Sequence, residues 1–215
     1  TMDFELDDNE ARVLGALVEK DLTTPDQYPL SRNALITACN QKSNREPIME
    51  MSDAEVTGSV ASLVDKALAT ERSIAGSRVT RYAHRMSSGL GIRFDFSANA
   101  LGVLTVLMLR GPQTPGEIRS RTARLCDFKS IEQVERALNE LVNANQGPFA
   151  VRLERRPGFK EARFAHLMCG PVTEDMSAPS PSTGRSSSAE RMERLESDVA
   201  SLRAELDALK ASLGE

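Results

Sequence analysis

The two histidines are the first candidates for chemistry, and they occur in two nearly identical segments. His84 lies in RYAHRM (residues 81–86) and His166 in RFAHLM (residues 163–168). Catalysis or metal binding would require a base, a nucleophile or a further ligand at a workable spacing, and neither histidine has one. The chain also lacks tryptophan and a glycine-rich phosphate loop. We therefore expect structural histidines placed by duplication, in a protein that is not an enzyme.

Cysteine spacing limits metal and redox chemistry in the same way. Cys39, Cys126 and Cys169 are an odd number without short paired spacings, so they indicate neither a disulfide framework nor a thiolate zinc site. We expect no metal and no cofactor. The acidic N-terminal stretch lacks the features of an export signal, and no apolar run approaches the roughly 18 residues that span a bilayer. The sequence therefore predicts a cytoplasmic protein without a membrane segment.

Basic side chains are concentrated in one part of the chain, although the net charge is −4. Residues 89–170 carry 12 Lys and Arg against 8 Asp and Glu, whereas residues 1–88 carry 10 against 14. A polyanion such as nucleic acid would dock on the basic part, where the side chains can contact phosphates without reading sequence. The alternative is ordinary solvated arginines paired with Glu154 and Glu161. We call the candidate residues the basic surface: Arg119, Arg121, Arg124, Arg152, Arg155, Arg156 and Lys160.

A polar loop at residues 40–47 is the second candidate surface, because it is richer in amides and charges than a spacer requires. Amide side chains can also cap helices and satisfy loop backbone, which is the structural alternative. The candidate binding residues are Asn40, Gln41, Lys42, Asn44 and Arg45.

The elements that must position these residues are present twice. Ser52, Val56 and Leu63 recur 78 residues later as Ser130, Val134 and Leu141, and Leu14-Gly15 recurs 87 residues later as Leu101-Gly102. Such self-similarity indicates a duplicated fold unit. We call residues 1–88 the first repeat and residues 89–170 the second repeat, and we expect each to be a domain.

Each repeat shows the pattern of three helices followed by a hairpin. In the first, helices are expected from Asp8, from an N-cap at Ser31 and from a capping box of Ser52 with Glu55. The corresponding elements of the second repeat are helices at 98–109, at 114 onward with a Thr114–Glu117 capping box, and at 130–144. The hairpin strands are expected at 69–74 and 79–85, and at 149–156 and 159–168. The fold class is α+β, mainly α, in a tandem winged-helix arrangement. A three-helix bundle with a packed ribbon is the alternative.

The remaining chain is read as a linker and a coiled coil. Residues 171–188 are rich in proline and serine and suit a flexible linker. Residues 189–215 carry apolar side chains at alternating spacings of three and four, which predicts a coiled coil that pairs two copies in parallel. A single helix folding back on its own domains is the alternative. The dimerisation residues are Met192, Leu195, Val199, Leu202, Leu206, Leu209 and Leu213.

Acidic side chains on the third helix of each repeat complicate the functional reading. In a winged helix this element normally enters the major groove. Glu132, Glu135 and Glu140 in the second repeat, with Asp53 and Glu55 in the first, would be repelled by DNA. The sequence leaves two functions open. One is a nucleic-acid-associated or regulatory protein that uses the basic surface, and the other is an interaction scaffold that uses the acidic third helices.

Several stretches of the chain resemble one family over nearly its whole length. They are TTPDQYPLS at 23–31, ACNQKSNREP at 38–47, LRGPQTPGEIRSR at 109–121, GPFAVRL at 147–153 and the C-terminal heptads. These are similar to the signatures of the YceH-like family of bacterial proteins. The resemblance implies tandem winged-helix domains followed by a coiled coil, and it supplies no active site to carry over.

Overall fold

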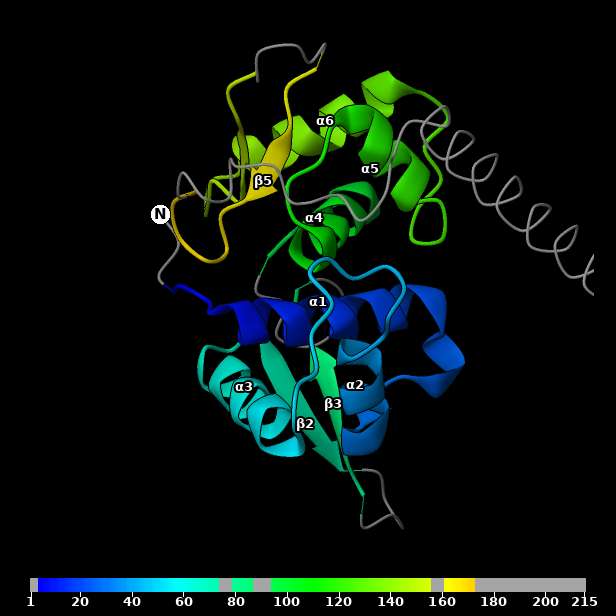
Figure 1. Cartoon of the computed structure of the whole chain (residues 1–215), viewed down its shortest axis with the longest axis vertical. Helices are drawn as coiled ribbons and strands as arrows, with labels where there is room; N and C mark the ends of the chain where they lie inside the picture. Colours follow the sequence, from blue (N-terminus) through cyan, green and yellow to red (C-terminus); the bar gives the residue numbers. More distant parts are fainter. Residues whose placement is uncertain (1–3, 74–78, 87–93, 156–160, 173–215) are drawn as a thin grey trace, which may run out of the picture. The chain divides into compact units, whose positions relative to one another are not determined.

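The computed structural model describes residues 4–73, 79–86, 94–155 and 161–172. In these ranges the protein is α+β and mainly helical, with two small antiparallel sheets (Figure 1). The first repeat contains α1 (Asp8–Thr23), a short 3₁₀ helix η1 (Pro25–Gln27), β1 (Leu30–Ser31), α2 (Arg32–Cys39), α3 (Asp53–Asp65), β2 (Ala69–Ser73) and β3 (Thr80–His84). The second contains α4 (Ala98–Arg110), α5 (Pro115–Arg121), α6 (Ile131–Val142), β4 (Ala150–Arg152) and β5 (Phe164–His166).

Side-chain caps fix the beginnings of most of these helices as the sequence predicts. Ser52 and Glu55 form a reciprocal capping box, in which the Ser52 N–H donates to Glu55 Oε2 at 2.7 Å. Thr114 and Glu117 do the same at the start of α5, with 3.0 Å between the Thr114 N and Glu117 Oε2. These boxes satisfy backbone donors that have no partner within the helix.

Ser130 is the exception, because its side chain caps no backbone N–H of α6. The expectation of a capped start there is wrong in this detail. Gln133, at the position that a capping box gives to its glutamate, turns back instead to Lys129, whose N–H donates to Gln133 Oε1 at 2.8 Å. The side-chain hydrogen bond at the start of α6 is therefore the one between Gln133 and the Lys129 backbone, and not a cap from Ser130.

A further short segment pairs with the last strand of each hairpin, which the sequence does not predict. β1 pairs with β3, with Leu30 opposite Tyr82, so the first sheet has the order β1-β3-β2. In the second repeat Gln113 makes the same kind of pair with Phe164, through N–H to carbonyl bonds of 3.0 and 2.7 Å. A strand of one or two residues carries no alternation that a sequence could display. The two repeats therefore share the same order of elements down to this edge.

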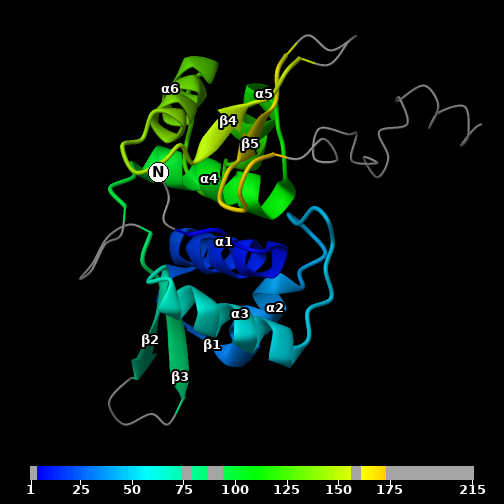
Figure 2. The same cartoon turned by 90° about the vertical axis from the view of Figure 1, so that its left-hand side faces the viewer.

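The two repeats pack on each other through α1 and α4. Figures 1 and 2 show α1 lying between α4 and the first sheet, and buried side chains of both repeats form one continuous hydrophobic core. Leu14 and Leu17 of α1 and Leu104 and Leu107 of α4 are fully buried in it. The close approach uses Gly15, where an added Cβ would lie 2.9 Å from Leu109 Cγ. A side chain at residue 15 would therefore separate the helices.

The N-terminal segment strengthens this connection. The Leu6 N–H donates to the Met168 carbonyl at 2.8 Å, and the Phe4 ring lies 6.1 Å from that of Phe94. Phe94 in turn packs edge-on against Phe149, with ring centroids 4.9 Å apart. The N-terminal segment of the first repeat therefore packs against both ends of the second repeat, at Phe94 and at Met168.

The division into domains stays a prediction. Its boundary at residue 88 lies in the range 87–93, outside the described residues, and the described parts of both repeats share one core. The coiled coil at 189–215 and all but the first two residues of the linker at 171–188 also lie outside the described residues. Within the described ranges, no helix has the length and apolar character that crossing a bilayer requires.

Gly15 and Gly58 provide a matched test of the packing between α1 and α4. Gly58 lies in α3 with open space around it, so Gly58→Ala should raise the free energy of unfolding by about 0.5–1 kcal/mol through helix propensity. Gly15→Ala should lower it by about 1–3 kcal/mol, because Leu109 is buried and cannot move aside freely. Urea unfolding measures both. Equal stabilisation by the two substitutions would show that the helices do not meet at Gly15.

Candidate functional site

A small cleft brings together parts of the two surfaces that the sequence predicts separately. The polar loop runs up to α4 beside this cleft (Figure 2). The Glu46 N–H of the loop donates to the Leu109 carbonyl at 2.9 Å. Arg121 and Arg124 of the basic surface and Asn44 of the polar loop all line this hollow. We call it the arginine cleft, and its lining residues are Glu19, Thr23, Asn44, Val106, Leu109, Arg110, Arg121, Arg124 and Leu125.

Two buried arginines hold the polar loop against α1. The Arg45 side chain is fully buried, and its guanidinium bonds both carboxylate oxygens of Glu19 at 3.2 and 2.6 Å and the Ala38 carbonyl. Arg12 donates to the carbonyls of Cys39 and Pro47 at 3.2 and 2.6 Å. Burial and the charge of Arg45 lower the pKa of Arg12. The loop is thus anchored to α1 and α2 by charge-assisted hydrogen bonds.

The predicted binding residues of the polar loop therefore divide into two groups. Asn40 clamps the loop, since its amide exchanges two 2.8 Å hydrogen bonds with the backbone of Met51. Arg45 is internal, and Gln41 Oε1 lies 3.4 Å from its Nη2. Lys42 and Asn44 are exposed. The side chains of Asn40 and Arg45 thus hold the loop in place through bonds within the fold. Asn44 instead lines the cleft, and its backbone is left-handed at φ 59°.

The basic surface is divided as well. Arg119 is exposed but braces the loop after α5, donating to the carbonyls of Phe128 and Lys129 at 3.3 and 3.0 Å. Arg121 lies 3.5 Å from Glu117, one turn earlier on α5. Arg124, three residues beyond the end of the helix, is exposed in the cleft.

The hairpin arginines form a separate group. Arg152 and Arg155 are exposed on and after β4, and in the described residues neither shows a carboxylate within ion-pair distance. The structure shows no contact between them and the cleft in the part of the chain that it describes. Arg156 and Lys160 lie outside the described residues, as do all seven dimerisation residues at 192–213.

Arg110 is a cleft residue that the sequence analysis missed. It ends α4, and its Nη1 donates to Asn44 Oδ1 of the other repeat at 3.1 Å. Its Nε is buried without a hydrogen-bond partner in the described structure. Burial lowers the pKa of Arg110 and the charge of Arg121 lowers it further, whereas Glu46 and Glu117 act in the opposite direction. The available signal was its place just before Gly111-Pro112, where a helix must end and a cation is favoured.

The two histidines occupy equivalent strand positions but different surroundings. The His84 Nδ1 accepts from the Met86 N–H at 3.1 Å, which leaves Nε2 to donate to Asp21 at 2.9 Å. Both ring nitrogens are therefore engaged within the fold. His166 lies opposite Ala150 as His84 lies opposite Ala69, but burial alone lowers its pKa to about 4, so its ring is neutral. The offset of the repeats puts buried Met108 where the first repeat has Asp21.

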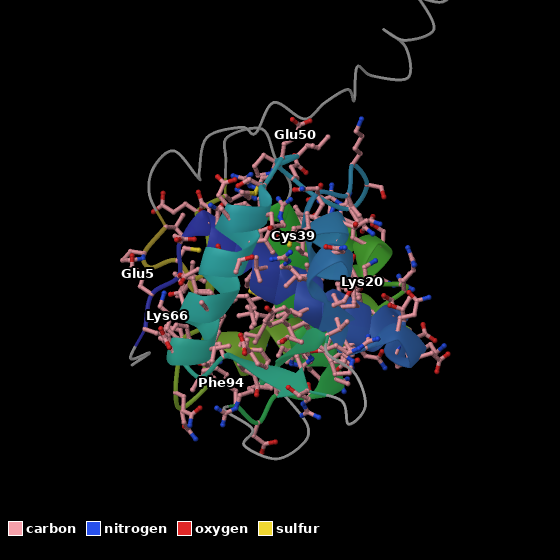
Figure 3. All side chains as sticks on the ribbon, turned by 90° about the horizontal axis from the view of Figure 1, so that it is seen from below. Glu5, Lys20, Cys39, Glu50, Lys66 and Phe94 are labelled. Atoms are coloured by element: carbon pink, nitrogen blue, oxygen red, sulfur yellow. The ribbon has the colours of Figure 1, made fainter. Side chains whose placement is uncertain are left out.

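The cysteines are free thiols, and burial raises the pKa of Cys39, Cys126 and Cys169 to about 12, 11 and 12. They are protonated at neutral pH and are therefore poor nucleophiles. Figure 3 shows Cys39 in the middle of the molecule, with Lys20 and Lys66 on opposite sides. Among the described side chains, no group of three or more histidine, cysteine, aspartate or glutamate residues is arranged to hold a metal ion.

Several acidic residues of the third helices are engaged within the fold. Asp53 lies 3.3 Å from Arg32, and Glu55 serves the capping box of α3. Glu140 accepts from the N–H and hydroxyl of Ser97 at 2.8 and 2.7 Å, which secures the start of α4. Glu132 and Glu135 of α6 remain exposed. The acidic face offered to a partner is thus smaller than the sequence suggests.

The described chain is a mainly helical α+β protein with a repeated order of elements, and its relatives place it in a family. Residues 6–159 match the family described as "Protein of unknown function, DUF480". A UPF0502 protein of Aliivibrio fischeri is 46% identical over 203 residues, 94% of both chains. One of Vibrio parahaemolyticus is 47% identical over 213 residues, 99% of this chain and 98% of its own.

The UPF0502 protein YceH of Salmonella paratyphi B is 46% identical over 217 residues, covering all of both chains. The chain therefore belongs to this family, and the resemblance to YceH-like proteins is confirmed.

The two groups of polar-loop residues can be distinguished by stability measurements. Arg45→Met should lower the free energy of unfolding by about 3 kcal/mol, because it leaves the Glu19 carboxylate without its buried partner. Lys42→Met, at an exposed position of the same loop, should change it by less than about 0.5 kcal/mol. Urea unfolding of both variants is the measurement, and a small effect of Arg45→Met would refute the anchoring role.

His166 predicts a pH dependence of stability. Burial lowers its pKa to about 4 in the folded protein, whereas an exposed histidine has a pKa of 6.5. Between these pH values the unfolded chain therefore binds a proton that the folded chain does not. Stability from this group is present above pH 6.5 and is lost as the pH falls toward 4. Between pH 7 and 4, His166→Gln should lose about 3 kcal/mol less unfolding free energy than the unmodified protein. Equal losses in urea unfolding would contradict the prediction.

Proposed function

We propose that this protein is a non-enzymatic binding protein made of two winged-helix modules, and that it associates with nucleic acid through the basic surface. The repeated order of three helices and a hairpin, with one added antiparallel pairing at the edge of each hairpin, supports the winged-helix assignment. We further propose that residues 189–215 pair two copies through a parallel coiled coil. Three free cysteines suit a reducing, cytoplasmic setting.

The observation that carries the nucleic-acid proposal is the exposure of Arg124, Arg152 and Arg155 without a carboxylate partner in the described structure. Guanidinium groups without internal partners are available to phosphate oxygens, which they bind bidentately. Contacts of this kind position a protein on nucleic acid without reading its sequence. Two copies held by a coiled coil would add the strength of two weak sites.

A non-enzymatic role is supported by the state of the side chains that usually perform chemistry. The His84 ring is engaged at both nitrogens, His166 is buried, and the described thiols are protonated at neutral pH. The scaffold alternative rests on the acidic third helices. It is the weaker proposal, because Asp53, Glu55 and Glu140 serve internal bonds and leave Glu132 and Glu135 exposed.

The nucleic-acid proposal predicts salt-dependent binding that depends on the hairpin arginines. At about 50 mM salt the full chain should bind duplex or single-stranded DNA, with log affinity falling linearly against log salt. The variant Arg152→Glu with Arg155→Glu should bind at least about tenfold more weakly, with a salt slope shallower by about two. Fluorescence anisotropy across a salt series measures both quantities.

Two further proteins make this test specific. Arg32→Glu with Arg72→Glu reverses two exposed charges in the acidic first repeat, and this variant should stay within about threefold of the unmodified affinity. Leu202→Glu with Leu206→Glu should give monomers in analytical ultracentrifugation and weaken binding by loss of avidity. No binding at about 50 mM salt, or the same loss in the first-repeat variant, would reject the proposal.

A further inference from the structure

The arginine cleft contains more hydrogen-bond donors than its protein neighbours satisfy. Arg110, Arg121 and Arg124 each carry five N–H groups. Among the described residues, their acceptors are Asn44 Oδ1, 3.1 Å from Arg110, and Glu117 Oε1, 3.5 Å from Arg121. The Arg110 Nε is buried without a hydrogen-bond partner in the described structure. Arg124 is exposed, and no acceptor among the described residues lies within hydrogen-bond distance of its guanidinium.

The carboxylates near the cleft are largely committed elsewhere. Both carboxylate oxygens of Glu19 accept from Arg45, so the negative charge of this lining residue is already balanced by a buried guanidinium. Glu117 uses Oε2 to accept from the N–H and hydroxyl of Thr114 at 3.0 and 3.1 Å. Glu46 contributes an opposite charge near Arg110. Three guanidinium groups therefore share one hollow with few acceptors pointing at them.

We infer that the arginine cleft binds one phosphate group through Arg110, Arg121 and Arg124, with Asn44 of the other repeat fixing Arg110 in place. A phosphate offers enough oxygens for several guanidinium forks, whereas a carboxylate serves only one or two. The apolar side chains Val106, Leu109 and Leu125 also line the hollow and limit the water that competes for the donors. The site goes beyond the proposed function, because it needs no nucleic acid.

Helix ends offer a competing explanation for two of the three arginines. Arg110 ends α4 and Arg121 ends α5, where a cation offsets the partial negative charge of the last carbonyls. Arg124 lies three residues beyond α5, outside the range of that effect. The helix-end explanation predicts that these arginines affect stability equally with and without phosphate, and this difference makes the two explanations separable.

Isothermal titration calorimetry of the full chain with inorganic phosphate, at constant ionic strength, tests the site. We expect saturable binding to one site per chain. Arg121→Gln with Arg124→Gln should weaken it at least about tenfold, because two of the three forks are lost. Arg32→Gln with Arg72→Gln removes the same charge at two exposed positions of the first repeat outside the cleft, and this variant should stay within about twofold. Circular dichroism confirms that each variant is folded.

Either of two results would overturn the inference. One is the absence of saturable binding by the unmodified protein, and the other is an equal loss in the cleft variant and the first-repeat variant. Thermal unfolding gives an independent readout, since added phosphate should raise the Tm of the unmodified protein and of the first-repeat variant but not of the cleft variant.

The source of the phosphate is decided by comparing ligands. A 5′-phosphorylated nucleotide should bind and its unphosphorylated nucleoside should not, and equal binding of both would contradict a phosphate site. If a 5′-phosphorylated oligonucleotide binds more tightly than the nucleotide, the site holds a nucleic-acid end. If the two bind alike, the site holds a small phosphorylated compound. Phosphate binding without any DNA binding would leave this inference standing and reject the proposed function, and the reverse result would do the opposite.

Discussion

The close packing of α1 against α4 is the constraint on which the rest of the described structure depends. Gly15 lets the two helices approach until Leu109 fills the space that a side chain would take. Buried leucines from both helices then extend one apolar core through both repeats. Because the polar loop is anchored to α1 and reaches α4, the same contact also creates the arginine cleft. A site assembled from two repeats exists only while those repeats hold this orientation.

Much of the local structure could be predicted from the sequence, because its causes are local. Ser31, Ser52 and Thr114 define helix starts through bonds to residues three positions away, and the sequence displays that spacing. The added pairing at the edge of each hairpin could not be predicted, since Leu30 or Gln113 alone carries no periodicity. The interior position of Arg45 was equally hidden, because it depends on Glu19, 26 residues away. Arg110 was missed for the same reason, as its partner Asn44 belongs to the other repeat.

Duplication explains where the histidines stand but not what surrounds them. In the first repeat the ring is held by Asp21 and the Met86 backbone, whereas His166 is simply buried. The copies have also diverged in charge, so that the basic side chains gather in one and the acidic N-terminal segment belongs to the other. Sequence comparison between the repeats therefore predicts the fold of each well, and the environment of an individual side chain poorly.

The bond from the Leu6 N–H to the Met168 carbonyl has a consequence for how the protein is made. A ribosome releases Leu6 long before Met168, so the nascent first repeat emerges with this edge of its structure incomplete. The Phe4 ring likewise has no Phe94 to pack on until about 90 more residues have been synthesised. Met168 leaves the exit tunnel long after the segment that it contacts, so the contacts of residues 4–6 form only once translation has passed the second repeat.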